Sequence, residues 1–106
     1  MSLPHSIREI SQGTQYQGEN ETIVYTITTT NWAASPTTPS MVVKNNSTGA
    51  DVTSTIAPSG SITASGDVIT LKPLTAMTAG TTYRVEVQFT VGSNTFEVYF
   101  FVLCEV

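Results

Sequence analysis

The chain has 106 residues, which suits one domain built around a single hydrophobic core. Its formal net charge is −4, so it lacks the basic surface by which proteins bind nucleic acid. Only 11% of the residues are charged, so Thr, Ser and Asn must supply the polar surface of strands and turns. No apolar run is long enough to cross a bilayer, and a single cysteine excludes an intrachain disulfide.

A flexible tail is expected over residues 1–9, followed by one folded domain over residues 10–106. Chain termini are poorly ordered unless something ties them down, and the single histidine, His5, lies in this segment. The segment lacks the apolar stretch of a signal peptide, which predicts a protein made in the cytoplasm without a secretion signal.

The rest of the chain predicts strands rather than helices. β-branched and aromatic residues recur between clusters of Gly, Pro, Asn and Ser, the pattern of an all-β sandwich or barrel. The first long strand is expected over residues 22–30, with Ile23, Tyr25 and Ile27 facing inward. The loop that follows contains Trp32, which is expected to cap one end of the core.

A hairpin is expected next, around a turn at residues 46–49. This turn places Val43 opposite Val52, so both side chains can point inward. The second strand of the hairpin is expected over residues 50–57.

Another hairpin is expected to turn at Ser65-Gly66. A two-residue turn at this position places Ile62 opposite Ile69, and again the inward residues of the two strands meet.

The C-terminal hairpin carries the clearest pattern in the sequence. Its first strand alternates apolar and polar residues, and its turn at Gly92-Ser93 suits type II′ because glycine takes the first central position. The inward pairs are then Val91 with Asn94, Phe89 with Phe96, Val87 with Val98, and Val85 with Phe100. The outward pairs are Glu86 with Tyr99, Arg84 with Phe101, and Thr82 with Leu103. A slip by one residue would bury a charged side chain, which register logic disfavours.

The last expected strand is apolar on both faces. One parity carries core side chains, and the other carries Tyr99, Phe101 and Leu103. Residues 3–10 or the long loop could fold back over these three side chains, and Arg84 could lie on Phe101. Alternatively, the three side chains and Arg84 form an interface with another chain, because large apolar surface patches usually mark contact sites.

Residues 74–87 resemble the corner between strands E and F of fibronectin type III and other immunoglobulin-like domains. There a leucine and a Gly-Thr pair precede a tyrosine that enters an alternating strand, as Leu74 and Tyr83 do here. The resemblance implies that the Tyr83 hydroxyl bonds to the backbone a few residues upstream. Met77 stands where the family usually has leucine, and Ala79 where it often has proline. The implied fold is all-β, an immunoglobulin-like antiparallel β-sandwich of about seven strands.

A wider resemblance runs from about residue 10 to the C-terminus. The segments that carry it are 15–18, 22–32, 35–44, 51–53, 65–71 and 79–87. They are similar to small immunoglobulin-like proteins of phage and prophage structural modules, of the fibre–tail adaptor or tail-accessory kind. The resemblance implies a non-enzymatic virion component that contacts other virion proteins or its own copies. It implies no cofactor, catalytic residue or metal site.

Catalysis is the weaker interpretation of this sequence. With a single histidine, neither a metal cluster nor a Ser-His-acid arrangement can be assembled from the usual residues. Glu86 and Glu97 share one outer sheet face and are the pair that an enzyme would need, but a flat face lacks a cleft. Cys104 faces inward and is expected to act as a small hydrophobic residue, with a reactive or intermolecular thiol as the other option.

A further hypothesis is an accessory module that binds carbohydrate. Trp32 and neighbouring loop residues would then stack on a sugar ring. We expect Trp32 in the core or at its rim instead, because a lone tryptophan in a sandwich usually packs there.

Overall fold

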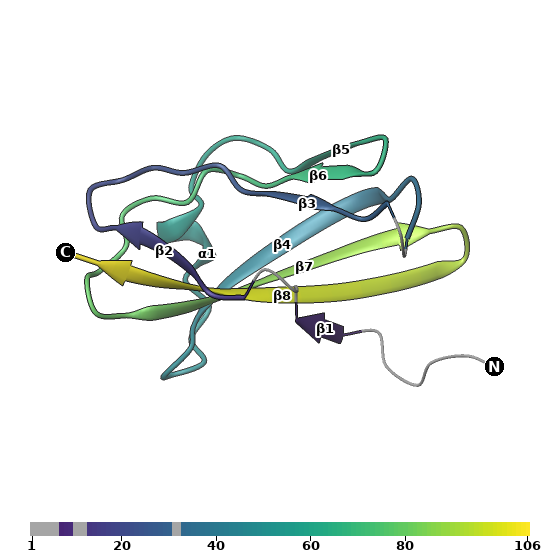
Figure 1. The fold of residues 1–106 in the computed structure, drawn as a ribbon. Helices are drawn as coiled ribbons and strands as arrows, with labels where there is room; N and C mark the ends of the chain where they lie inside the picture. The colour runs from purple at the N-terminus through teal and green to yellow at the C-terminus, as the bar shows by residue number, and fades with distance from the viewer. Residues whose placement is uncertain (1–6, 10–12, 31–32) are drawn as a thin grey trace.

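The computed structural model describes residues 7–9, 13–30 and 33–106, which form two packed β-sheets (Figure 1). This confirms the all-β, immunoglobulin-like sandwich. Eight strands and one short helix lie in the described residues: β1 (Ile7–Glu9), β2 (Gln15–Gly18), β3 (Thr26–Thr28), β4 (Thr37–Asn45), α1 (Thr53–Ile56), β5 (Thr63–Ser65), β6 (Val68–Thr70), β7 (Thr82–Val91) and β8 (Asn94–Glu105).

The larger sheet has the order β1-β8-β7-β4, with β2 also paired to β8, and the smaller sheet has the order β3-β6-β5. Both β1 and β2 run parallel to β8 and cover its edge, with Ile7 beside Glu97 and Gln15 beside Val102. β1 therefore lies within residues 1–9, the segment expected to be a flexible tail. His5 and Trp32 lie outside the described residues.

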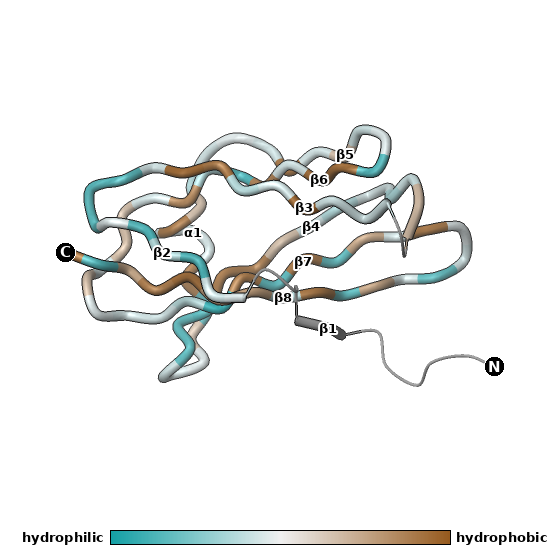
Figure 2. Tube along the Cα trace, in the orientation of Figure 1, coloured by the Kyte–Doolittle hydropathy of each residue, from teal (hydrophilic) through white to brown (hydrophobic). Residues whose placement is uncertain are grey.

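The core lies between the two sheets and is made of their inward-facing side chains. Figure 2 shows hydrophobic residues recurring along β7 and β8. Val43 of β4, Ile69 of β6, Val85 of β7 and Val102 of β8 are completely buried, which is the one-faced burial that an alternating strand predicts.

The structure confirms every pair predicted for the C-terminal hairpin. The observed register includes Val91 with Asn94, Phe89 with Phe96, Glu86 with Tyr99, and Arg84 with Phe101. Gly92 has a φ of 59°, the left-handed value that a type II′ turn needs at its first central residue. Turn chemistry and period-two patterning agree here, so the local sequence is enough to set the register.

The strand expected over residues 50–57 is wrong beyond Val52, where the chain enters α1. Val52 does donate a backbone hydrogen bond to Val43, 2.8 Å, so the predicted hairpin pairing is confirmed at that point. Asp51 then accepts hydrogen bonds from the backbone N–H and the hydroxyl of Thr53, at 2.9 and 2.6 Å. This Asx-type turn diverts the backbone from the strand and starts the short helix.

The hairpin of β5 and β6 turns one residue later than predicted. Ala64, rather than Ile62, lies opposite Ile69, and the turn falls at Gly66-Asp67. The φ of Gly66 is 57°, so glycine takes the left-handed position at the start of the turn. Ile62 and Ala64 share one face, so the inward parity survives the shift.

The corner before β7 has the hydrogen bond implied by the fibronectin resemblance. The Tyr83 hydroxyl accepts a bond from the backbone N–H of Thr78 at 3.0 Å, and the Tyr83 side chain is 4% exposed. The bond ties the loop before β7 to the core.

Replacing Tyr83 with phenylalanine should lower the free energy of unfolding by about 1–2 kcal/mol, because the Thr78 N–H loses its partner. Urea unfolding followed by circular dichroism measures the change. The control is Tyr16→Phe, at an exposed position, where no comparable loss is expected. Equal effects of the two substitutions would contradict the role given to the corner.

Candidate functional site

The candidate site is the outer face, defined as the side of the β2-β8-β7-β4 sheet that points away from the core. β8 contributes Tyr99, Phe101 and Leu103 to this face, and Tyr16 of β2 lies beside Leu103. These four residues are called the apolar strip. Alternation sends them outward because Val98, Phe100, Val102 and Cys104 of the same strand point into the core.

The apolar strip is partly covered by its own members. Tyr99 and Phe101 pack edge to face with ring centroids 5.6 Å apart, and both are half-buried, as is Leu103. Tyr16 is 60% exposed and is the most accessible member of the strip. β1 and β2 lie along the edge of β8. Much of residues 3–10, one of the two segments expected to cover these side chains, lies outside the described residues.

A charged group lies beside the apolar strip. The Arg84 guanidinium carbon lies 3.9 Å from the centroid of the Tyr99 ring, rather than over Phe101 as expected. Glu86 pairs with Tyr99 across the two strands and attracts the Arg84 guanidinium toward the Tyr99 ring. The distance between Arg84 Nε and Glu86 Oε2 is 2.8 Å. Lys44 Nζ lies 3.6 Å from Glu86 Oε1.

The contact between Arg84 and Glu86 is an ion pair rather than a hydrogen bond. The Arg84 Nε–H has no hydrogen-bond partner among the described residues, despite the short distance to the carboxylate. The N–H therefore does not point along the line to the carboxylate oxygen. Partly exposed ion pairs contribute little to the free energy of unfolding. We therefore infer that this pair mainly positions the Arg84 side chain on the outer face.

The outer face carries charges of both signs. Lys44 and Arg84 are two of the four basic residues, and Glu86, Glu97 and Glu105 supply negative charges on the same face, since they share its strand parity. The described part of this face is therefore mixed in charge and slightly acidic. An aromatic face of mixed charge suits contact with another protein better than it suits a strongly charged ligand.

Glu86 and Glu97, the pair considered for catalysis, both line a depression of about 190 Å³ on the outer face. The other lining residues are Ser40, Met41, Val42 and Gln88. This lining includes no histidine, cysteine or cation that could assist two carboxylates in acid–base chemistry.

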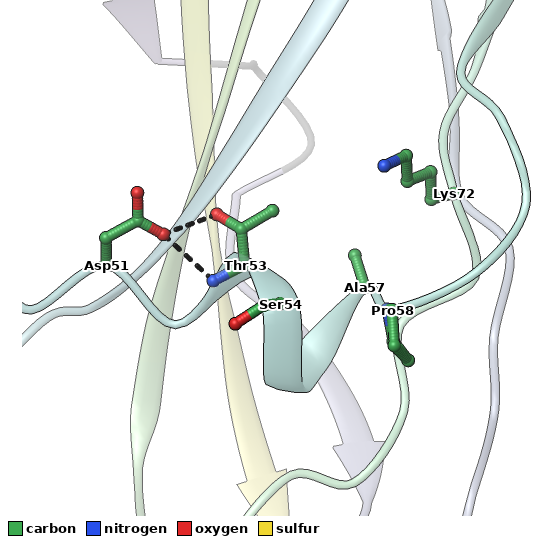
Figure 3. A pocket seen from close by; sticks show the side chains of 6 residues that line it. All are labelled: Asp51, Thr53, Ser54, Ala57, Pro58 and Lys72. Atoms are coloured by element: carbon green, nitrogen blue, oxygen red, sulfur yellow. Dashed lines mark hydrogen bonds between the residues drawn. The ribbon is translucent and has the colours of Figure 1, made fainter.

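A second depression, of about 530 Å³, lies beside α1 and is lined by Asp51, Thr53, Ser54, Ala57, Pro58 and Lys72 (Figure 3). Figure 3 shows Asp51 and Lys72 at opposite sides of this space. The Asp51 carboxylate is engaged by Thr53, and these two hydrogen bonds lower the pKa of Asp51. The polar groups do not converge on a common point, so we interpret the depression as the surface of a turn.

Within residues 7–9, 13–30 and 33–106, no three His, Cys, Asp or Glu side chains are placed to hold a metal ion. In the same ranges, no helix is long and apolar enough to span a bilayer. The carbohydrate hypothesis rests on Trp32, which lies outside these ranges.

Cys104 lies in the core and is 1% exposed. Burial raises the pKa of its thiol, and the nearby charges of Glu19 and Glu105 raise it further. The thiolate, which is the reactive form, is therefore disfavoured in the folded protein.

Cys104 should react with a thiol reagent at pH 8 at least about 100-fold more slowly in the folded chain than in urea. As the pH rises, the thiol of the unfolded chain loses its proton near the ordinary pKa of 9.0, before the thiol of the folded chain does. The contribution of the Cys104 thiol to the free energy of unfolding should therefore be fully present below that pH and should decrease as the pH rises above it. Rapid labelling of the native protein would contradict this placement of Cys104.

Gln17 and Tyr16 reverse the usual hydropathy pattern of a strand. Gln17 is 1% exposed, and its side-chain amide donates hydrogen bonds to the backbone carbonyls of Leu74 and Glu21 at 2.7 and 3.0 Å. The Tyr25 hydroxyl donates to Gln17 Oε1 at 3.0 Å. Because Gln17 turns inward, Tyr16 turns outward and joins the apolar strip.

No protein-family model matches the sequence, and no curated protein or solved structure is significantly similar to it. The inference of function therefore depends on this chain's own residues and geometry.

Proposed function

We propose that this chain is a non-enzymatic structural component of a phage or prophage particle, of the tail or fibre-adaptor kind. In this proposal it binds neighbouring virion proteins through the outer face. The observation that carries the proposal is the apolar strip on the outer face, with the Arg84 guanidinium over the Tyr99 ring. The virion context comes from the sequence resemblance.

The composition of the outer face supports a protein partner. Tyrosine, phenylalanine and arginine are enriched at protein interfaces, where rigid rings supply contact area at low cost in side-chain entropy. Small-molecule sites instead need a concave pocket with converging polar groups. The depression beside α1 lacks such convergence, and the depression lined by Glu86 and Glu97 has no other ionisable group in its lining.

Arg84 has a specific part in this proposal. It keeps its guanidinium over Tyr99 and beside Glu86, so the ring and the charges are already arranged before a partner arrives. Pre-arranged side chains lose less conformational entropy on binding than mobile ones. Truncating a central aromatic residue of such a face typically costs more than about 2 kcal/mol of binding free energy.

The test compares Phe101→Glu with the matched control Val68→Glu. Val68 is 37% exposed on the smaller sheet, so both substitutions place a new carboxylate on a partly exposed apolar strand position. Each variant is produced in the bacterium that makes the particles, and purified particles are analysed by quantitative mass spectrometry. We expect the wild-type chain and Val68→Glu in the particles and at least a tenfold lower content of Phe101→Glu.

Circular dichroism on each purified variant checks that it folds. Absence of the wild-type chain from the particles would contradict the virion role. Equal incorporation of folded Phe101→Glu would contradict the outer face as the contact surface.

A further inference from the structure

β3 (Thr26–Thr28) forms one edge of the smaller sheet, and the described residues place no strand against its outer side. β3 ends the β3-β6-β5 sheet, and in Figure 1 its neighbours β6 and β5 lie on one side of it. The bonded segment extends beyond the strand itself, since Ile23 exchanges two backbone hydrogen bonds with Leu74 and Thr29 donates one to Asp67. One side of residues 23–29 is therefore paired.

The other side of this segment presents open backbone groups. In an antiparallel sheet, alternate residues direct both N–H and C=O to the same neighbour. Ile23, Tyr25 and Thr29 bond to the β6 side, so the backbone groups of Val24, Thr26 and Thr28 point to the free side. The side chains of these three residues are exposed, and that of Val24 is 51% exposed.

The other sheet edges are interrupted, partly paired or short. β4 has a register shift between Thr37 and Ser40, with Pro39 within it and Thr38 at a φ of 47°. Such bulges and prolines protect an edge, and a left-handed β-branched residue is strained. The outer edges of β1, β2 and β5 are short, at three, four and three residues, whereas the bonded segment at β3 runs from residue 23 to residue 29. Residues 22–30 contain no charge, no proline and no glycine.

We propose that two copies of this chain pair through β3, antiparallel, with Thr26 of one copy opposite Thr26 of the other. In this register Val24 lies opposite Thr28 of the second copy, and each of the three pairs exchanges two backbone hydrogen bonds. The two smaller sheets become one continuous sheet with six strands. A strand that is its own partner around a twofold axis gives a closed, symmetric dimer.

A second copy suits this edge because the contact avoids the acidic charge of the chain. Backbone pairing needs no charge, and the threonine side chains can pack and hydrogen-bond across the strands. The nearest acidic residue along the chain is Glu21, five positions before Thr26. Antiparallel pairing places the two Glu21 residues about ten positions apart, roughly 33 Å, where salt screens their repulsion.

The experiment measures the mass by sedimentation velocity and the protection of amides by hydrogen exchange, from about 10 µM to 1 mM protein. The edge variant is Thr26→Pro, which removes the outward N–H without removing a bond to β6. Thr26→Lys is a second edge variant that keeps the N–H and adds like charges. Thr26→Val is the matched control, because it keeps both the N–H and the strand preference.

We expect a dimer in which the amides of Val24, Thr26 and Thr28 become at least tenfold more protected as concentration rises. Thr26→Pro and Thr26→Lys should weaken the dimer at least tenfold, while Thr26→Val and Phe101→Glu leave it intact. The last variant separates this contact from the proposed virion interface. A monomer up to 1 mM, or a dimer with those three amides unprotected, overturns the proposal.

Discussion

Replacing Gln17 with alanine should lower the free energy of unfolding by about 3 kcal/mol. The substitution removes the two donors that meet the carbonyls of Leu74 and Glu21, and the acceptor for the Tyr25 hydroxyl. The Leu74 carbonyl still accepts a hydrogen bond from the Ile23 N–H. The loss of stability therefore comes mainly from the Glu21 carbonyl, the Tyr25 hydroxyl and the lost packing of the side chain. Each unmet polar group in a buried site costs about 1–3 kcal/mol.

Gln15 offers a control on the same strand. Its side chain has only a long contact of 3.4 Å with the Gly13 carbonyl, so Gln15→Ala should change stability by less than about 0.5 kcal/mol. Urea unfolding of both variants gives the comparison. If Gln17→Ala were no more harmful than Gln15→Ala, the bonds of Gln17 would not be what holds β2 against the smaller sheet.

Phe100 and Phe101 should respond very differently to truncation, although they are neighbours on β8. Phe100 is 4% exposed and packs against the Tyr25 ring with centroids 5.6 Å apart. Phe100→Ala should therefore cost about 3–5 kcal/mol, because it leaves a cavity between the sheets. Phe101 is half-buried on the outer face, and Phe101→Ala should cost about 1 kcal/mol.

The pair tests the assignment of the two faces of β8. Urea unfolding gives the stability of each variant, and the content of Phe101→Ala in particles gives the functional effect. We expect Phe101→Ala to fold and yet bind its partners more weakly. Similar losses of stability from the two substitutions would mean that both faces of β8 belong to a core.

The sequence predicts the C-terminal hairpin well because its information is local. Alternation in β7 and a glycine at the first turn position leave one register in which apolar residues meet. The outward position of Tyr99, Phe101 and Leu103 follows directly from that register. The hairpin of β5 and β6 is shorter, and its turn is misplaced by one residue because Gly66 can occupy either central position.

The contribution of β2 could not be predicted from local pattern. Its parallel pairing with β8 joins residues more than 80 positions apart, and hydropathy would bury Tyr16 and expose Gln17. The observed arrangement is the reverse because Leu74, Glu21 and Tyr25 satisfy the Gln17 amide. The same inversion completes the apolar strip, so the most exposed aromatic residue of the site was missed.

The most direct test of the central claim is hydroxyl-radical footprinting of the outer face, comparing the free chain with the chain in assembled particles. Oxidation of Tyr16, Tyr99 and Phe101 reports solvent access at the apolar strip, and Val68 on the opposite sheet serves as the reference. We predict at least a threefold loss of labelling at the three aromatic residues on assembly, with Val68 unchanged. Unchanged labelling of the apolar strip in particles that contain the chain would show that the outer face is not the contact surface.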